Sequence, residues 1–189
     1  MVLHEVEREV ALYDAGGEER ARVRFRKEGP LRVVEPRDAA WRDGTFYLAD
    51  RGGRRIKMLR ADGTDGGEID LPFAPERVAV TEAGIAIVPL VLGVGENELL
   101  YLWRDGELRP GGVPVARVGD WRLAAMANQA SLVPFPDGRL VVAHQFIVPG
   151  AHVVAPGGGV SGLALPLPDG LRGAFGRLPR PPFTEEELQ

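Results

Sequence analysis

The sequence predicts an all-β protein built from a repeated unit of four short antiparallel strands. Two observations lead to this fold class. First, the 189 residues include 25 Gly and 16 Pro, residue types that interrupt chains made of many short elements joined by tight turns. Second, the same order of apolar runs and Gly-bearing turns returns at a period of about 40 residues, which is typical of repeat architectures.

The clearest unit covers residues 36–74. Turn signals at Asp43-Gly44 and Asp62-Gly63 separate apolar runs of strand length. The four strand candidates of this unit are residues 37–41, 45–50, 55–59 and 68–71.

The same order returns in residues 75–117 and 129–167, and residues 10–27 form one hairpin, or half a unit. In each full unit the second strand candidate is the most apolar, as expected for a strand that is buried on both faces. Stacked sheets of this kind are the blades of β-propellers. The sequence therefore predicts a β-propeller-like array of about three and a half four-stranded antiparallel blades, an incomplete propeller.

We expect residues 1–170 to form a single domain of this kind. The hairpin should supply the two outer strands of an incomplete blade. Residues 171–189 are Pro-rich and acidic, which predicts a loose C-terminal tail. Helix is expected only in short turns and in residues 122–128.

Several short motifs carry a family resemblance, which is strongest in residues 28–72. The motifs are Glu28-Gly29-Pro30, Glu35-Pro36-Arg37-Asp38, Asp43-Gly44, Phe46-Tyr47-Leu48-Ala49-Asp50, Arg55-Ile56 and Asp62-Gly63. Together they resemble an NHL-type repeat, as found in six-bladed propellers. The next two units share only the strand order and the Asp-Gly turns. The resemblance implies that Asp50 and Arg55 form a structural signature pair that fixes the turn between the second and third strands.

Composition and charge exclude several classes of partner and site. The formal net charge of -4 predicts no nucleic-acid partner and no binding to an anionic membrane surface. The absence of Cys excludes disulfides, thiolate metal sites and Cys nucleophiles. No apolar stretch reaches the roughly 20 residues of a membrane helix.

Acidic residues stand where a secretory signal would need a basic region and then an apolar run. They are Glu5, Glu7 and Glu9. We therefore expect a cytoplasmic protein, or a periplasmic or extracellular one if the N-terminus is truncated.

Trp121, Asn128 and Gln129 are the candidate ligand contacts. They belong to a stretch that lengthens the link between two units. Loops that enter an inner strand lie near the central channel of a propeller, where ligands commonly bind. The alternative interpretation is that these residues pack within the long loop.

For two other groups of polar residues we favour a structural role over a binding site. His144 and His152 stand on facing strand candidates, but no third metal ligand is evident between them, which favours packed or hydrogen-bonded histidines. Three cations, Arg22, Arg24 and Arg26, alternate with apolar residues. They predict a solvated outer strand whose charges deter edge pairing, or alternatively a patch for a phosphate or an acidic partner.

Two functions from different classes fit these features. The first is a non-catalytic β-propeller-type binding or scaffold module, with no cofactor and with a protein, peptide or glycan ligand. The alternative is a metal-dependent hydrolase, a lactonase or esterase that resembles the gluconolactonase propellers and binds calcium. Its candidate metal ligands would be Glu28, Asn97 and Asn128. The first is favoured because the spacing after Glu28 departs from that family, and no catalytic residue is assigned.

Three units and a hairpin cannot close a six-bladed ring. Sheet faces that pack on a neighbouring blade are apolar, so open terminal blades would expose apolar faces. We therefore expect this chain to self-associate or to require the missing remainder of a longer propeller. A compact four-bladed monomer is the third alternative.

Overall fold

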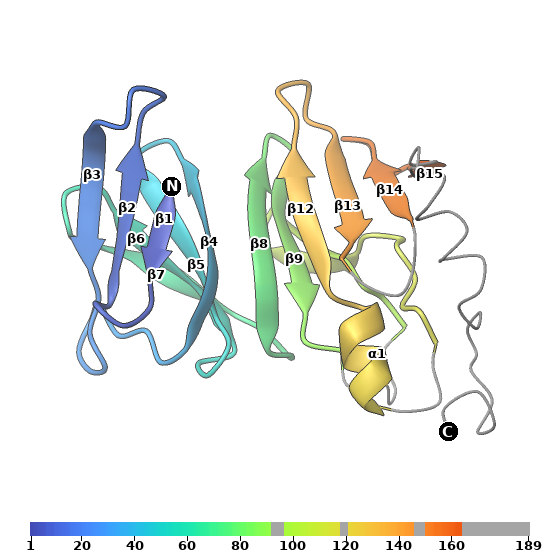
Figure 1. Cartoon of the computed structure of the whole chain (residues 1–189), viewed down its shortest axis with the longest axis horizontal. Coiled ribbons are helices and arrows are strands. Elements are labelled where there is room, and N and C mark those ends of the chain that lie inside the picture. The colour runs from blue at the N-terminus through green and yellow to red at the C-terminus, as the bar shows by residue number, and fades with distance from the viewer. Residues whose placement is uncertain (92–96, 118–120, 146–149, 164–189) are drawn as a thin grey trace, which may run out of the picture. The chain divides into compact units, whose positions relative to one another are not determined.

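The computed structural model describes residues 1–91, 97–117, 121–145 and 150–163. Nearly all regular structure in these ranges is β-strand (Figure 1). The strands form one three-stranded sheet and three four-stranded sheets, in which each strand pairs with the next strand in the chain. The predicted fold class, an all-β array of four-stranded antiparallel sheets, is confirmed.

The strands are assigned to four sheets in chain order. The first sheet contains β1 (Val2–His4), β2 (Glu9–Tyr13) and β3 (Glu19–Arg24). The second contains β4 (Pro36–Arg42), β5 (Thr45–Asp50), β6 (Arg55–Arg60) and β7 (Asp65–Asp70). The third contains β8 (Pro75–Thr81), β9 (Gly84–Pro89), β10 (Tyr101–Arg104) and β11 (Glu107–Pro110). The fourth contains β12 (Ala130–Pro134), β13 (Leu140–His144), β14 (Ala151–Val154) and β15 (Val160–Leu163).

The chain divides into two compact units, which we describe separately. Unit 1 comprises residues 1–80 and 84–89. Unit 2 comprises residues 81–83 and 90–189.

The N-terminal region forms a three-stranded sheet instead of the predicted hairpin. Its additional strand, β1, pairs with β2 in the register Val2↔Ala11 and His4↔Glu9. The connecting turn contains Arg8, whose φ of 57° lies in the left-handed region. The sequence prediction missed β1 because a strand of three residues is too short to show an alternating pattern.

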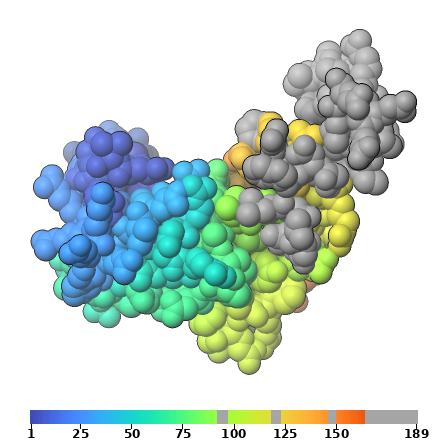
Figure 2. Space-filling model, turned by 90° about the horizontal axis from the view of Figure 1, so that it is seen from below, coloured from blue at the N-terminus to red at the C-terminus, as the bar shows by residue number. Residues whose placement is uncertain are grey.

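The core of unit 1 lies between the first and second sheets, which form adjacent layers in Figure 1. Phe46 is fully buried there and packs against Trp41, with ring centroids 4.5 Å apart and ring planes tilted by 57°. The other buried members of this cluster are Val10, Val23, Phe25, Val33, Ala39, Leu48 and Leu59. Figure 2 shows the outside of this packing: light-blue atoms of the segment before β4 adjoin cyan and green atoms of β5 to β7.

Two hairpin turns confirm the predicted role of the Asp-Gly pairs. Asp43 and Gly44 have φ values of 47° and 76°, and Asp105 and Gly106 have values of 53° and 82°. Positive φ at both central residues is the type I′ geometry, whose twist matches that of the flanking strands. Asp tolerates this region and Gly adopts it freely, so the two turns specify the β4–β5 and β10–β11 hairpins locally.

The segment before β12 contains the predicted helix. The structure places α1 at Trp121–Ala127, within one residue of the predicted bounds. No helix in the described ranges is long and apolar enough to cross a membrane. The tail predicted at residues 171–189 and the last four residues of the third predicted unit, 164–167, lie outside the described residues.

Candidate functional site

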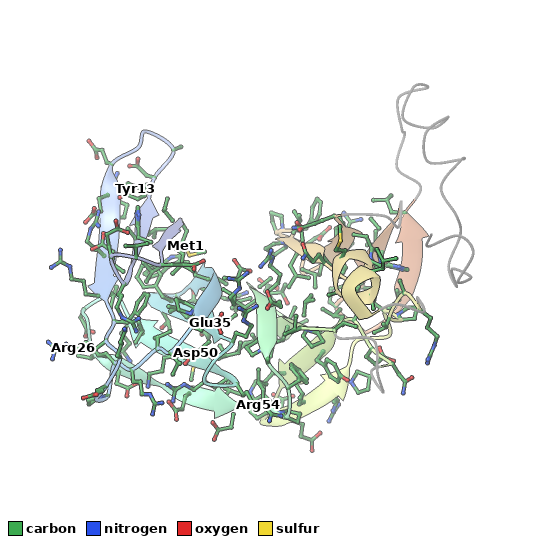
Figure 3. The ribbon with its side chains drawn as sticks, turned by 60° about the horizontal axis from the view of Figure 1, so that its bottom comes forward. Met1, Tyr13, Arg26, Glu35, Asp50 and Arg54 are labelled. Carbon is green, nitrogen blue, oxygen red and sulfur yellow. The ribbon has the colours of Figure 1, made fainter. Side chains whose placement is uncertain are left out.

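In unit 1, Asp50 holds together the loop that leads into β4. Asp50 ends β5 and is fully buried. Its Oδ1 accepts hydrogen bonds from the backbone N–H groups of Val34 at 2.9 Å, Glu35 at 2.8 Å and Gly53 at 3.2 Å. Glu35 and Asp50 accordingly lie close together in Figure 3. The carboxylate therefore serves as the hydrogen-bond acceptor of three backbone N–H groups that would otherwise need water as their acceptor.

Arg55 neutralises Asp50 from the start of β6. Its Nε donates to Oδ2 of Asp50 at 3.0 Å. The remaining guanidinium nitrogens donate to the Glu68 carboxylate and to the Arg32 carbonyl, each at 2.9 Å. The pair thus ties β5, β6, β7 and the loop before β4 to one another, which is a structural role. No room remains beside it, since a Cβ on Gly53 would lie 2.3 Å from Oδ2 of Asp50.

A second polar network in unit 1 links the starts of β4 and β8. Arg51 donates to Glu76 at 2.8 Å and also pairs with Glu35, and Arg37 approaches Glu76 at 3.4 Å. The hydrogen bond from Arg51 is the main reason that the pKa of Glu35 is lowered, against the opposing effect of burial. These charges are satisfied by one another and join neighbouring sheets within unit 1.

Asp38 adds a further carboxyl group to the same pair of strands. The Val78 N–H donates to its Oδ2 at 3.0 Å. Burial raises the pKa of Asp38 above its ordinary value, and the hydrogen bond from Val78 only partly opposes this. Asp38 is therefore fixed in place by the backbone of β8.

In unit 2, Asn128 fastens α1 to the preceding segment. Its side chain is 3% exposed. The amide Oδ1 accepts from the Ala116 N–H at 2.7 Å, while Nδ2 donates to the carbonyls of Ala116 and Ala124, both at 2.9 Å. This candidate ligand contact therefore uses its donors and its acceptor within the protein.

The other two candidate ligand contacts flank this anchor. Gln129 is exposed directly before β12, and Trp121 is the first residue of α1. Met126 on α1 is 43% exposed. An apolar side chain near the C-terminal end of α1 and a polar side chain just after the helix thus lie on either side of Asn128 in the sequence, which fastens this segment.

His144 in the fourth sheet stands at the position that Asp50 has in the second sheet, the end of the second strand. Its Nδ1 lies 3.0 Å from the Ala127 carbonyl. A carbonyl only accepts, so Nδ1 carries a proton and Nε2 of the neutral ring is an acceptor. The ring meets His152 edge-on at a centroid distance of 5.9 Å. In both sheets, the residue at this position secures the segment that enters the first strand.

Burial lowers the pKa of His144, and the nearby His152 adds to this effect. A lowered pKa in the folded state means that the unfolded chain binds the proton more readily. This group's contribution to stability is therefore complete above its ordinary pKa of about 6.5 and is lost as the pH falls below it. We expect the melting temperature to fall between pH 7 and pH 5, and to fall less in His144→Gln. If the melting temperatures of the wild type and His144→Gln fell by the same amount between pH 7 and pH 5, the assignment to His144 would be wrong.

Two of the three candidate calcium ligands already bond within the chain. Oδ1 of Asn97 accepts from Arg117 at 2.7 Å, and Oδ1 of Asn128 is bonded as described above. Glu28 is an exposed residue of unit 1. Within the described residues, no three His, Asp or Glu side chains form a group that would hold a metal ion.

Unit 2 also has a shallow pocket of about 180 Å³. Two arginines line it, Arg104 and Arg109. Arg104 approaches Asp105 at 3.4 Å, and Arg109 donates to Glu107 at 3.0 Å. Both cations are therefore paired with acidic neighbours on the same hairpin.

Comparison with known proteins identifies the fold. No family model and no curated protein matches the sequence. Solved structures do match. One is virginiamycin B lyase from Staphylococcus aureus, with 12% identity and a TM-score of 0.54. The match covers 87% of this chain and 51% of the lyase chain. A member of the DUF4221 family from Bacteroides vulgatus has 12% identity and a TM-score of 0.59, and the match covers 82% of this chain and 51% of the other. A gluconolactonase from Xanthomonas campestris has 20% identity, a TM-score of 0.53 and coverage of 86% and 56%.

These matches are propeller-type structures. The chain has a β-propeller fold. It spans about half the length of the matched propellers, so the described sheets correspond to part of a propeller ring. At these identities the likeness concerns the fold alone.

The sequence reasoning missed the network of Arg51, Glu35 and Glu76. The sequence does contain a signal for part of this network. Arg37 follows Pro36 in one four-strand repeat, and Glu76 follows Pro75 in the next repeat. Equivalent positions of adjacent propeller blades lie side by side, so opposite charges there predict an ion pair between β4 and β8.

Proposed function

We propose that this chain is a non-catalytic β-propeller-type binding module whose ligand is a protein, a peptide or a glycan. The observation that supports this proposal is the way in which its polar side chains are used. Asp50, Arg51, Arg55 and Asn128 all bind other parts of the chain and hold loops in fixed positions. Rigidly held loops on a β-scaffold are a common basis for recognition.

The ligand contacts under this proposal lie at the C-terminal end of α1. Met126 and Gln129 are exposed there, beside the buried anchor Asn128. An apolar and an amide side chain on a fixed segment suit a partner that buries apolar area and needs few charges. Trp121, at the start of α1, is the third candidate contact under this proposal.

Selection of ligands against the purified chain tests this function. A displayed peptide library and a printed glycan array are the two probes, and they distinguish the classes of ligand. Binders should lose at least tenfold in affinity with Met126→Asp or Gln129→Lys. Val6→Asp is the matched control, because Val6 is 89% exposed in unit 1 and its substitution should leave affinity unchanged. Equal effects of all three substitutions, or binders that none of them weakens, would refute the placement of the contacts.

Calcium distinguishes this module from the lactonase alternative. A ligand that binds only the folded state at 100 times its dissociation constant stabilises by about 2.7 kcal/mol. For a chain of this size, that corresponds to an increase in melting temperature of roughly 5–10 °C. Because Asn97 and Asn128 already bond within the chain, we expect 1 mM calcium to change the melting temperature by less than about 1 °C. A calcium-dependent increase together with hydrolysis of gluconolactone would establish the alternative.

A further inference from the structure

Two of the three histidines of this chain lie together on the fourth sheet. They belong to the neighbouring strands β13 and β14 (Figure 1). His152 pairs with Val142, and side chains two residues apart on a strand share a face, so His144 and His152 lie on the same face of the sheet. The pair includes none of the candidate ligand contacts and none of the candidate calcium ligands.

The separation of the two rings suits a shared metal ion. An imidazole nitrogen lies about 2.0–2.1 Å from a bound zinc ion. Two rings that share the ion then have their centres roughly 4.5–6.5 Å apart, depending on the angle at the ion. The observed centroid distance of 5.9 Å lies within this range. Small rotations of the two side chains can therefore turn one nitrogen of each ring onto the same ion.

The hydrogen bond of His144 prepares its other ring nitrogen for such an ion. Nδ1 carries the proton and faces the Ala127 carbonyl at 3.0 Å, so the lone pair is on Nε2. Histidines that bind metals almost always donate their second ring N–H in this way, to a carbonyl, a carboxylate or water. Such a bond fixes the tautomer and the ring orientation, and it makes the metal-binding nitrogen more basic.

The ring nitrogens of His152 are available as well. No described residue forms a hydrogen bond with either of them, and both histidines are half-buried. Neither these nitrogens nor Nε2 of His144 is among the buried atoms that lack a partner, which means that solvent reaches all of them. A hydrated ion can therefore reach the pair.

The flanking strands leave room beside the two rings. Gly162 of β15 is the cross-strand partner of His152, and Ala130 of β12 is the partner of His144. A Cβ on Gly162 would meet no described atom within 4 Å beyond its chain neighbours. The two smallest residue types thus border the pair, and the space next to His152 can hold an ion with its water ligands.

We propose that His144 and His152 bind a zinc ion, with water in its remaining positions. Imidazole suits zinc, copper and nickel, whereas calcium and magnesium require oxygen ligands. The described residues place no third His, Asp or Glu beside the pair, so the ion keeps open positions. In this respect the site is unlike structural zinc sites, which are closed by four protein ligands. The proposal goes beyond the binding function proposed above and does not depend on it.

Calorimetric titration of the full chain with Zn²⁺ at neutral pH tests the proposal, together with the NMR ring-proton signals of the three histidines. One zinc ion should bind per chain, and the signals of His144 and His152 should shift together. His144→Gln and His152→Ala should each weaken binding at least about tenfold, since even second-shell partners of a metal contribute about 10–100-fold. The matched control is His4→Asn, because His4 lies on β1 in unit 1 and its loss should leave the affinity unchanged. Ca²⁺ should give neither heat nor shifts.

Several results would overturn the proposal. Absence of zinc binding would show that the two rings only contact each other. A shift of one histidine alone would mean that the rings share no ion. Binding that survives both substitutions, or that His4→Asn weakens equally, would place zinc on other groups. The NMR titration uses the wild-type chain, so it decides the question even if a variant fails to fold. It needs no peptide or glycan, so its outcome is separate from that of the proposed function.

Discussion

Replacing Asp50 with Ala is expected to destabilise unit 1 by about 3–5 kcal/mol, since removal of one member of a buried charge pair leaves the other uncompensated. The substitution also removes the acceptor of three backbone N–H groups, at Val34, Glu35 and Gly53. Buried donors without partners add to the loss. Total stabilities of domains are about 5–15 kcal/mol, so the variant should lose a large share of its free energy of unfolding. The midpoint of urea unfolding, followed by circular dichroism, measures the effect.

Two further substitutions make this measurement specific. Asp50→Asn keeps one oxygen acceptor but loses the charge that pairs with Arg55, so its midpoint should fall between those of the wild type and the Ala variant. Asp70→Ala is the surface control, because Asp70 is exposed at the end of β7 and its loss should change stability by less than about 0.5 kcal/mol. If Asp50→Ala behaved like Asp70→Ala, the carboxylate would have no structural role.

Asn128→Ala is expected to destabilise unit 2 by about 2–4 kcal/mol, because it leaves the N–H and the carbonyl of Ala116 without their partner beside a buried position. The Ala124 carbonyl loses the side-chain amide but keeps the bond from the backbone N–H of residue 128. Loss of the side chain also separates α1 from the segment before it. Thermal unfolding followed by circular dichroism gives the size of the change.

Asn128→Asp is the sharper comparison. Asp has nearly the shape of Asn, but it presents an oxygen to the two carbonyls that Nδ2 contacts. Repulsion between these acceptors should make the variant no more stable than Asn128→Ala. Asn97→Ala is the matched control, since Asn97 is exposed. A stable Asn128→Ala protein that fails to bind a selected ligand would instead identify Asn128 as a ligand contact.

The strands were accessible from the sequence because their signals are local. Asp43-Gly44 specifies a type I′ turn within two residues, and the apolar runs beside it are long enough to show their alternation. The sequence did not predict β1, because a strand of three residues is too short to show alternation of apolar and polar side chains.

The site was less accessible than the fold, because its bonds join residues that are distant in sequence. Arg51 contacts Glu76 across 25 positions, and Asn128 contacts Ala116 across 12. The motif around Asp50 and Arg55 was an exception, since five positions separate the two and their family resemblance named them.

Every sheet is a meander, in which each strand pairs with its neighbour in the chain, and this has a consequence during synthesis. Ribosomes add about 5–20 residues per second, so a segment the length of one four-stranded sheet emerges within roughly 2–8 seconds. A β-hairpin forms in about 1–10 µs, and no strand must wait for a distant partner. Sheets can therefore be completed one at a time in order from the N-terminus. A chain interrupted between sheets would then carry finished sheets and no unpaired inner strand.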